Sequence, residues 1–77
     1  MHIQELSPGD RVSLVSFGAT DIIYRRRLLV MGITYNTPIT LLRIAPLGCP
    51  LQISVRGTIL IIRKHEARHL VWEHVHV

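Results

Sequence analysis

The fold is decided by residues 51–63, which read Leu51-Gln52-Ile53-Ser54-Val55-Arg56-Gly57-Thr58-Ile59-Leu60-Ile61-Ile62-Arg63. The first five residues alternate between apolar and polar side chains, a pattern typical of a strand with one buried face. Arg56-Gly57 then supplies a two-residue loop of the kind that closes a tight hairpin. The following strand is apolar at 59–62 and so on both faces, and such a strand is expected to lie centrally or partly under a helix. The stretch therefore predicts a β-hairpin inside a sheet.

Three further strands are predicted outside this hairpin. Residues 11–16 follow a Ser-Pro-Gly-Asp turn, residues 39–44 follow Pro38, and residues 70–76 alternate loosely between apolar and polar. Five short strands at intervals of roughly 8 to 12 residues are typical of small β-barrels. We therefore expect a mainly β protein with a closed, strongly bent, SH3-like barrel of five strands, because an OB-fold normally needs more residues.

Helical patterns occur in two places. The spacing of Tyr24, Leu28 and Met31 puts them on one face of a helix over about residues 21–31, which Thr20 or Asp21 can cap. Residues 65–69 predict a short helical turn before the last strand. The barrel therefore carries one short α-helix.

Length and composition limit the class of protein. With 77 residues, 48% hydrophobic side chains and one cysteine, the chain predicts a single domain over 1–77 that is neither disordered nor disulfide-bonded. Apolar runs no longer than four residues exclude a membrane-spanning helix, and no signal peptide is recognisable, so cytoplasm is the expected location. The net charge of +4 favours an acidic partner, an anionic membrane surface or nucleic acid.

The segment His65-Glu66-Ala67-Arg68-His69 matches the H-E-x-x-H pattern of zinc hydrolases. Such an enzyme also needs a long helix, a third ligand and a cleft, whereas about eight residues follow the match. We interpret the segment as two surface histidines on a short turn, with adventitious metal binding and hydrolysis as the alternatives.

Other candidate chemistry is weaker. Cys49, His65, His69, His74 and His76 contain no pair with the close spacing of a structural zinc clamp. No base marks Cys49 as a nucleophile, and no glycine-rich phosphate loop is present. The sequence therefore predicts no catalytic, cofactor-binding or metal-binding residue and no cofactor.

Arg25-Arg26-Arg27 is the most conspicuous run of charge. Successive helical residues are rotated by about 100°, so the three side chains cannot all face one ligand, and the stem of Arg27 falls beside the apolar face. With the other arginines they could form a basic surface for nucleic acid, but the few aromatic residues are scattered and offer no stacking platform. A solvated helix face is the simpler interpretation.

Taken together, the turns resemble those of the FeoA family. The matching segments are Leu6-x-Pro8-Gly9-Asp10-x-Val12, Arg25-x-Arg27-Leu28, Met31-Gly32-Ile33, Arg43-x-Ala45-Pro46-Leu47-Gly48-x-Pro50, Val55-Arg56-Gly57 and Leu60-x-Ile62-Arg63-Lys64-x-Glu66-Ala67-x-x-Leu70. One departure is Asn36, which stands near the place of a family glycine and can supply the left-handed residue there.

The resemblance implies a non-enzymatic SH3-like accessory protein of bacterial ferrous iron uptake. Its implied partner is the FeoB transporter, through the cytosolic GTP-binding domain, which would recruit the protein to the inner face of the membrane. We expect Arg25, Arg26, Pro46 and Leu47 to contact this partner, unless Leu47 packs back on the barrel. The alternative is a small basic barrel that binds nucleic acid.

Overall fold

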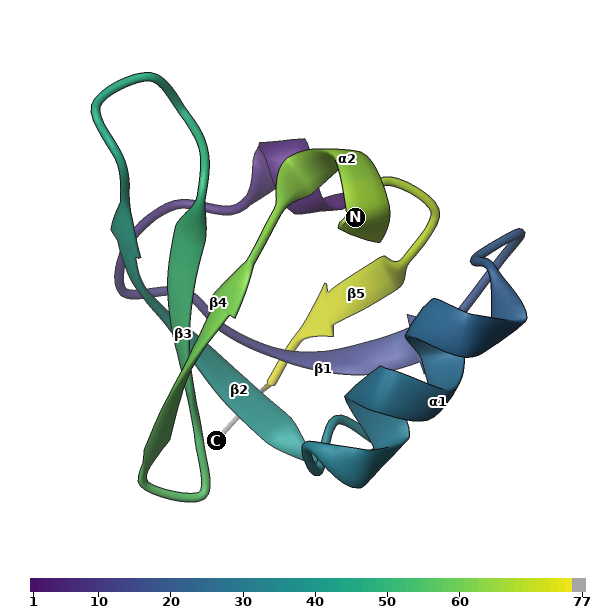
Figure 1. Ribbon diagram of the computed structural model, residues 1–77. Helices are drawn as coiled ribbons and strands as arrows, with labels where there is room; N and C mark the ends of the chain where they lie inside the picture. The colour runs from purple at the N-terminus through teal and green to yellow at the C-terminus, as the bar shows by residue number, and fades with distance from the viewer. Residues whose placement is uncertain (76–77) are drawn as a thin grey trace.

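The computed structural model describes residues 1–75 as a bent antiparallel sheet with helical segments around it (Figure 1). The elements are η1 (Ile3–Glu5), β1 (Arg11–Ser16), α1 (Ile22–Val30), β2 (Pro38–Ile44), β3 (Leu51–Val55), β4 (Thr58–Ile62), α2 (Lys64–Ala67) and β5 (Val71–His74). The five strands, the single longer helix and the helical turn before the last strand confirm the predicted mainly β, SH3-like class. Residue 76, the end of the predicted last strand, lies outside the described residues.

The expected closure of the barrel is wrong. The strand order is β4-β3-β2-β1-β5, so β4 and β5 are the two edges and do not pair with each other. After β4 the chain turns through α2 and returns to pair β5 with the far side of β1 (Figure 1). Sequence spacing indicated the strands but not this gap, because closure depends on how the two edge strands are oriented.

The core occupies the concave side of the sheet. Alternate residues of the strands point into it, and α1 covers part of it with Tyr24 and Leu28. The largest fully buried side chains are Trp72, Ile3, Leu28, Ile33, Ile39, Leu41, Leu51, Ile53, Ile62, Leu70 and Val12. This set joins every strand to η1 and to α1, so burial of apolar surface holds the sheet in its bent form.

The β3–β4 hairpin is confirmed, but the expected place of its second strand is not. Arg56 and Gly57 both have positive φ, 51° and 81°, as a two-residue loop matched to the strand twist requires. However, β4 lies at an edge, and Ile59 and Ile61 are 62% and 52% exposed. The sequence could not predict this position, because an apolar strand has the same pattern whether its outer face is covered by another segment or exposed to solvent.

Local polar contacts fix the ends of α1 as the sequence indicated. The carboxylate of Asp21 accepts hydrogen bonds from the backbone N–H groups of Ile23 and Tyr24, so Asp21 is the cap. At the other end the N–H of Ile33 donates to the carbonyl of Leu28 at 2.9 Å. Asn36 has a φ of 65°, so it does supply the left-handed residue.

The N-terminal residue pairs with the outer edge of β5 at Trp72. The amino group of Met1 donates to the carbonyl of Trp72 at 2.6 Å, and the N–H of Trp72 donates to the carbonyl of Met1 at 2.7 Å. This exchange gives β5 a backbone neighbour on the side away from β1. The two edges of the sheet therefore differ.

Gly18 lies where two connections pass close to each other, one after β1 and one before β5. A Cβ atom at Gly18 would lie 2.4 Å from the carbonyl oxygen of His69, and the residue has a φ of +58°. Gly57 has a similarly positive φ of +81°, but no atom lies within 4 Å of its would-be Cβ. A side chain added at Gly57 would therefore introduce backbone strain alone, whereas one added at Gly18 would introduce both backbone strain and steric overlap.

We predict that Gly18→Ala lowers the free energy of unfolding more than Gly57→Ala does. The control variant carries only the strain of a left-handed alanine, about 1 kcal/mol, whereas the overlap at Gly18 should add about 1 to 3 kcal/mol. Urea unfolding of both variants gives the comparison. Equal losses would show that the 17–18 and 68–69 segments are not packed together.

Candidate functional site

The β2–β3 loop, residues 45–50, projects beyond the sheet and is ordered by its own backbone (Figure 1). The N–H of Gly48 donates to the carbonyl of Ala45 at 2.7 Å, and the N–H of Ala45 donates to the carbonyl of Pro50 at 3.0 Å. Leu47 at the tip is 97% exposed and does not pack back on the barrel. Sequence reasoning had left these two placements of Leu47 open.

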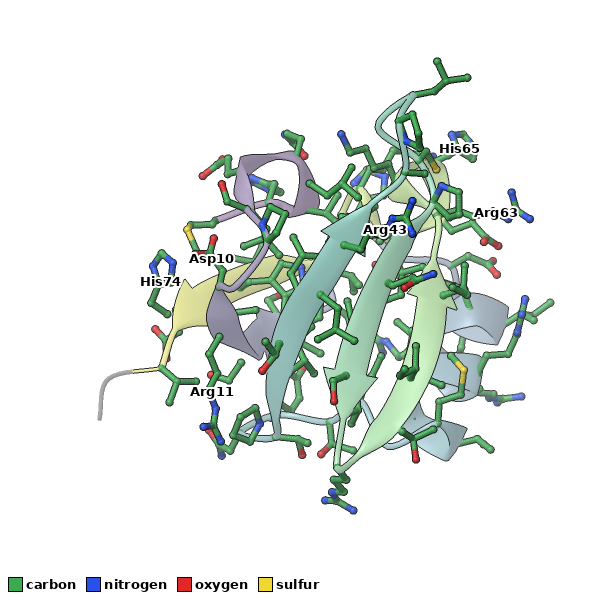
Figure 2. All side chains as sticks on the ribbon, turned by 90° about the vertical axis from the view of Figure 1, so that its left-hand side faces the viewer. Asp10, Arg11, Arg43, Arg63, His65 and His74 are labelled. Atoms are coloured by element: carbon green, nitrogen blue, oxygen red, sulfur yellow. The ribbon has the colours of Figure 1, made fainter. Side chains whose placement is uncertain are left out.

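Basic side chains gather at the base of this loop. Figure 2 shows Arg43, from β2, and Arg63, which follows β4, at the same end of the sheet. The Lys64 ammonium lies 3.4 Å from the position that a Cβ at Gly48 would take. Within residues 1–75 the ion pairs are His2 with Glu5 and His74 with Asp10, so these cations have no carboxylate partner there. The loop thus combines an apolar tip with a positively charged base.

The arginines of α1 have different environments, and the expectation that Arg25 lies free on the exposed side is wrong. Arg25 is half-buried, with its guanidinium carbon 5.0 Å from the centre of the Phe17 ring. Its buried Nε atom has no hydrogen-bond partner among the described residues. Arg26 is exposed, and Arg27 lies 6.0 Å from the centre of the Tyr24 ring, beside the apolar face as expected. Of the predicted helix pair, Arg26 is therefore exposed, whereas Arg25 is partly engaged in packing against Phe17.

The structure does not bring the four predicted partner-binding residues into one patch. Pro46 and Leu47 lie on the β2–β3 loop, whereas Arg25 and Arg26 lie on α1, which is far from this loop (Figure 1). A partner that contacts one group directly would therefore meet the other group only by extending around the barrel.

The sequence analysis missed an apolar surface on α1. Ile22, Ile23 and Val30 are exposed, and Val30 is 87% exposed. Ile23 and Val30 line a shallow pocket with Arg26, Arg27 and Met31. The seven-residue spacing of Ile23 and Val30 was a signal for this second apolar face, which the search for a buried face passed over.

The H-E-x-x-H segment does not form a continuous helix. It begins within α2, but α2 ends at Ala67, so His69 lies beyond the helix. His65 and Glu66 line a polar pocket with Asp21 and Tyr24, and Arg68 donates to the carbonyl of His65 at 2.5 Å. Within residues 1–75, no three histidine, cysteine, aspartate or glutamate side chains lie close enough together to hold a metal ion.

The remaining candidate residues, among those described, do not belong to a group of side chains that could hold a metal ion. Cys49 has a half-buried free thiol in the β2–β3 loop, and His74 lies near Asp10, with 3.6 Å between Nε2 and a carboxylate oxygen. His76 is outside the described residues. No helix of the described part of the chain is long and apolar enough to cross a membrane.

An open SH3-like barrel with an exposed leucine on a projecting loop and exposed basic side chains defines the class of this molecule as a small, mainly β protein. The chain belongs to the FeoA family, which is associated with ferrous iron transport, because the FeoA domain matches residues 1–74.

Solved structures agree with this assignment. The solution structure of the FeoA protein from Chlorobium tepidum is 33% identical and has a TM-score of 0.89, covering 99% of this chain and 71% of that one. A FeoA-like protein from Clostridium acetobutylicum is 27% identical with a TM-score of 0.83, covering 100% and 88%. A crystal structure of an iron uptake regulatory protein (FeoA) is 30% identical with a TM-score of 0.77, covering 95% and 93%.

Tyr24 joins α1 to the polar pocket beside α2. Burial raises the pKa of its phenol from 10.0 to about 12, the Glu66 carboxylate adds to this effect, and the Arg27 cation opposes it. Because the folded state holds the proton more tightly than the unfolded state, the contribution of Tyr24 to stability is full below about pH 10. This contribution is lost as the pH rises toward 12.

We predict that the free energy of unfolding of the native protein falls between pH 10 and 11.5 by about 1 kcal/mol more than that of Tyr24→Phe. Absorbance titration of Tyr35→Phe should show the Tyr24 phenol ionising about two pH units above a free tyrosine. Glu66→Gln should lower this pKa. A titration midpoint near pH 10 would contradict the burial of Tyr24.

Proposed function

We propose that this protein is a non-enzymatic accessory protein that binds and modulates a FeoB-type ferrous iron transporter through its cytosolic GTP-binding domain. Family membership supports a role in ferrous iron transport, and the exposed Leu47 supports binding by contact. In this proposal the protein is cytoplasmic and is held at the inner face of the membrane by its partner.

The β2–β3 loop is the proposed anchor. Burying the side chain of Leu47 in a partner would contribute about 1.5 to 3 kcal/mol. The loop is already ordered by its two internal hydrogen bonds and contains Pro46 and Pro50, so docking costs little conformational entropy. A single exposed leucine on such a loop is suited to fill a pocket of the partner.

The positive charge of this protein supports a partner whose binding surface is acidic. Arg43, Arg63 and Lys64 lie near the anchor, while Arg26 and the half-buried Arg25 extend the positive field from α1. Charges outside the buried centre of an interface act mainly on the rate of association. The helix arginines are therefore proposed to steer the encounter, and Pro46 and Leu47 to hold the complex.

We predict that Leu47→Ala weakens binding to a purified FeoB GTP-binding domain by about 1 to 3 kcal/mol, or roughly 5- to 150-fold, without changing the Tm. Val30→Ala is the matched control, because Val30 is also an apolar residue that is almost fully exposed, at 87%, but it lies on α1. Calorimetry gives both affinities. Equal binding by native protein and Leu47→Ala would remove the loop from the interface.

We also predict that Arg26→Ala slows association with the same domain several-fold at low salt and has no effect at about 0.5 M salt. Arg25→Ala should in addition lower the Tm, because Arg25 packs over Phe17. Stopped-flow mixing measures the rates. Binding of duplex or single-stranded DNA that falls steeply with salt, together with no binding to the transporter domain, would instead favour the nucleic-acid alternative.

A further inference from the structure

The outer edge of β4 carries unused backbone hydrogen-bonding groups. Val55 and Thr58 flank the two-residue loop and form the first pair of the hairpin, with Ile53 opposite Leu60 further along. In such a hairpin the hydrogen-bonded pairs alternate with pairs whose N–H and C=O groups point away from the partner strand. The backbone groups of Ile59 and Ile61 therefore face the free edge.

The side chains of the same two residues are available as well. Ile59 and Ile61 lie on the outer face of the sheet and are more than half exposed. Natural edge strands are usually blunted by a proline, a charge or a bulge. β4 reads Thr-Ile-Leu-Ile-Ile and pairs with β3 in regular register, so it has none of these protections.

The opposite edge of the sheet shows that this openness is specific to β4. There the backbone of Met1 exchanges two hydrogen bonds with Trp72 of β5. No described strand takes the corresponding place beside β4. Among the described residues, β4 is therefore the edge without any backbone neighbour on its outer side.

Charge at the two ends of β4 indicates which strand would fit. Arg56, in the turn before the strand, and Arg63, just after it, are exposed, and Lys64 follows. No acidic residue occurs between 51 and 65. A second copy of β4 paired antiparallel would bring Arg56 of one chain toward Arg63 and Lys64 of the other. Like-charge repulsion therefore disfavours self-pairing, and an acidic segment is complementary.

We propose that the free edge of β4 binds an extended segment of another protein, with alternating apolar residues and acidic ends, as a sixth strand. Its backbone pairs with Ile59 and Ile61, its apolar side chains cover these two isoleucines, and its acidic ends meet Arg56 and Arg63. This surface does not include Leu47, although its Arg63 also lies near the base of the β2–β3 loop. The inference does not depend on the proposed transporter contact.

The probe is a short synthetic peptide of alternating valine and threonine with two glutamates at each end. Titration into the isotope-labelled full chain should shift NMR signals of residues 58–63. It should also slow amide exchange at Ile59 and Ile61 at least tenfold, while the Leu60 amide, already directed toward β3, serves as an internal control. Unchanged exchange at Ile59 and Ile61 in saturating peptide would overturn the proposal.

Two variants test the backbone and the charge separately. Ile61→Pro removes an N–H that faces only the free edge, so peptide affinity should fall at least tenfold while Leu60 exchange stays slow. Arg63 lies outside β4, so Arg63→Glu leaves the strand itself unchanged. This variant should bind the glutamate-ended peptide more weakly, and a peptide with lysine ends more tightly, than the native protein does. Equal binding of both peptides by native protein would refute the acidic preference. Dimerisation of native protein that Ile61→Pro abolishes would assign the edge to a second copy instead.

Discussion

The pairing of β1 with both β2 and β5 is the constraint on which the rest of the structure depends. Residues near the two ends of the chain meet there, with Val12 opposite Ile39 on one side and His74 on the other. Val12 and Leu14 send their side chains into the core from the same strand. Without this long-range pairing, β2, β3 and β4 would form a meander with an uncovered apolar face, which is unstable in water.

Because β1 lies inside the sheet, between β2 and β5, the exposed segments lie at the periphery of the structure. The β2–β3 loop extends from one end of the sheet, and α1 lies away from it (Figure 1). On α1 the side chains of Ile23, Val30 and Arg26 are exposed. The edges are unequal, since Met1 occupies the outer side of β5 while β4 stays open. One small core thus leaves an exposed loop, an exposed helix face and an open sheet edge at separate places on the surface.

The positive charge also lies at the periphery of the structure. Within residues 1–75 the carboxylates of the ion pairs, Glu5 and Asp10, contact histidines, and the arginines are left without carboxylate partners. Arginines that are not used in internal pairs contribute little to stability but remain available to an acidic partner. Arg25 and Arg27 differ from the other arginines, because their guanidinium groups lie over the rings of Phe17 and Tyr24 and support the packing of α1.

The sequence by itself determined the local elements, since these depend on nearest neighbours. The Asp21 cap, the Arg56-Gly57 turn and the alternation over 51–55 predicted α1, the hairpin and β3 close to their observed bounds. Only the tertiary structure decided that the barrel stays open, that β4 is an edge and that Leu47 is exposed while Arg25 is half-buried. These properties depend on which distant segment lies beside each residue. A periodic pattern indicates which side chains are buried, but it does not indicate which segment covers them.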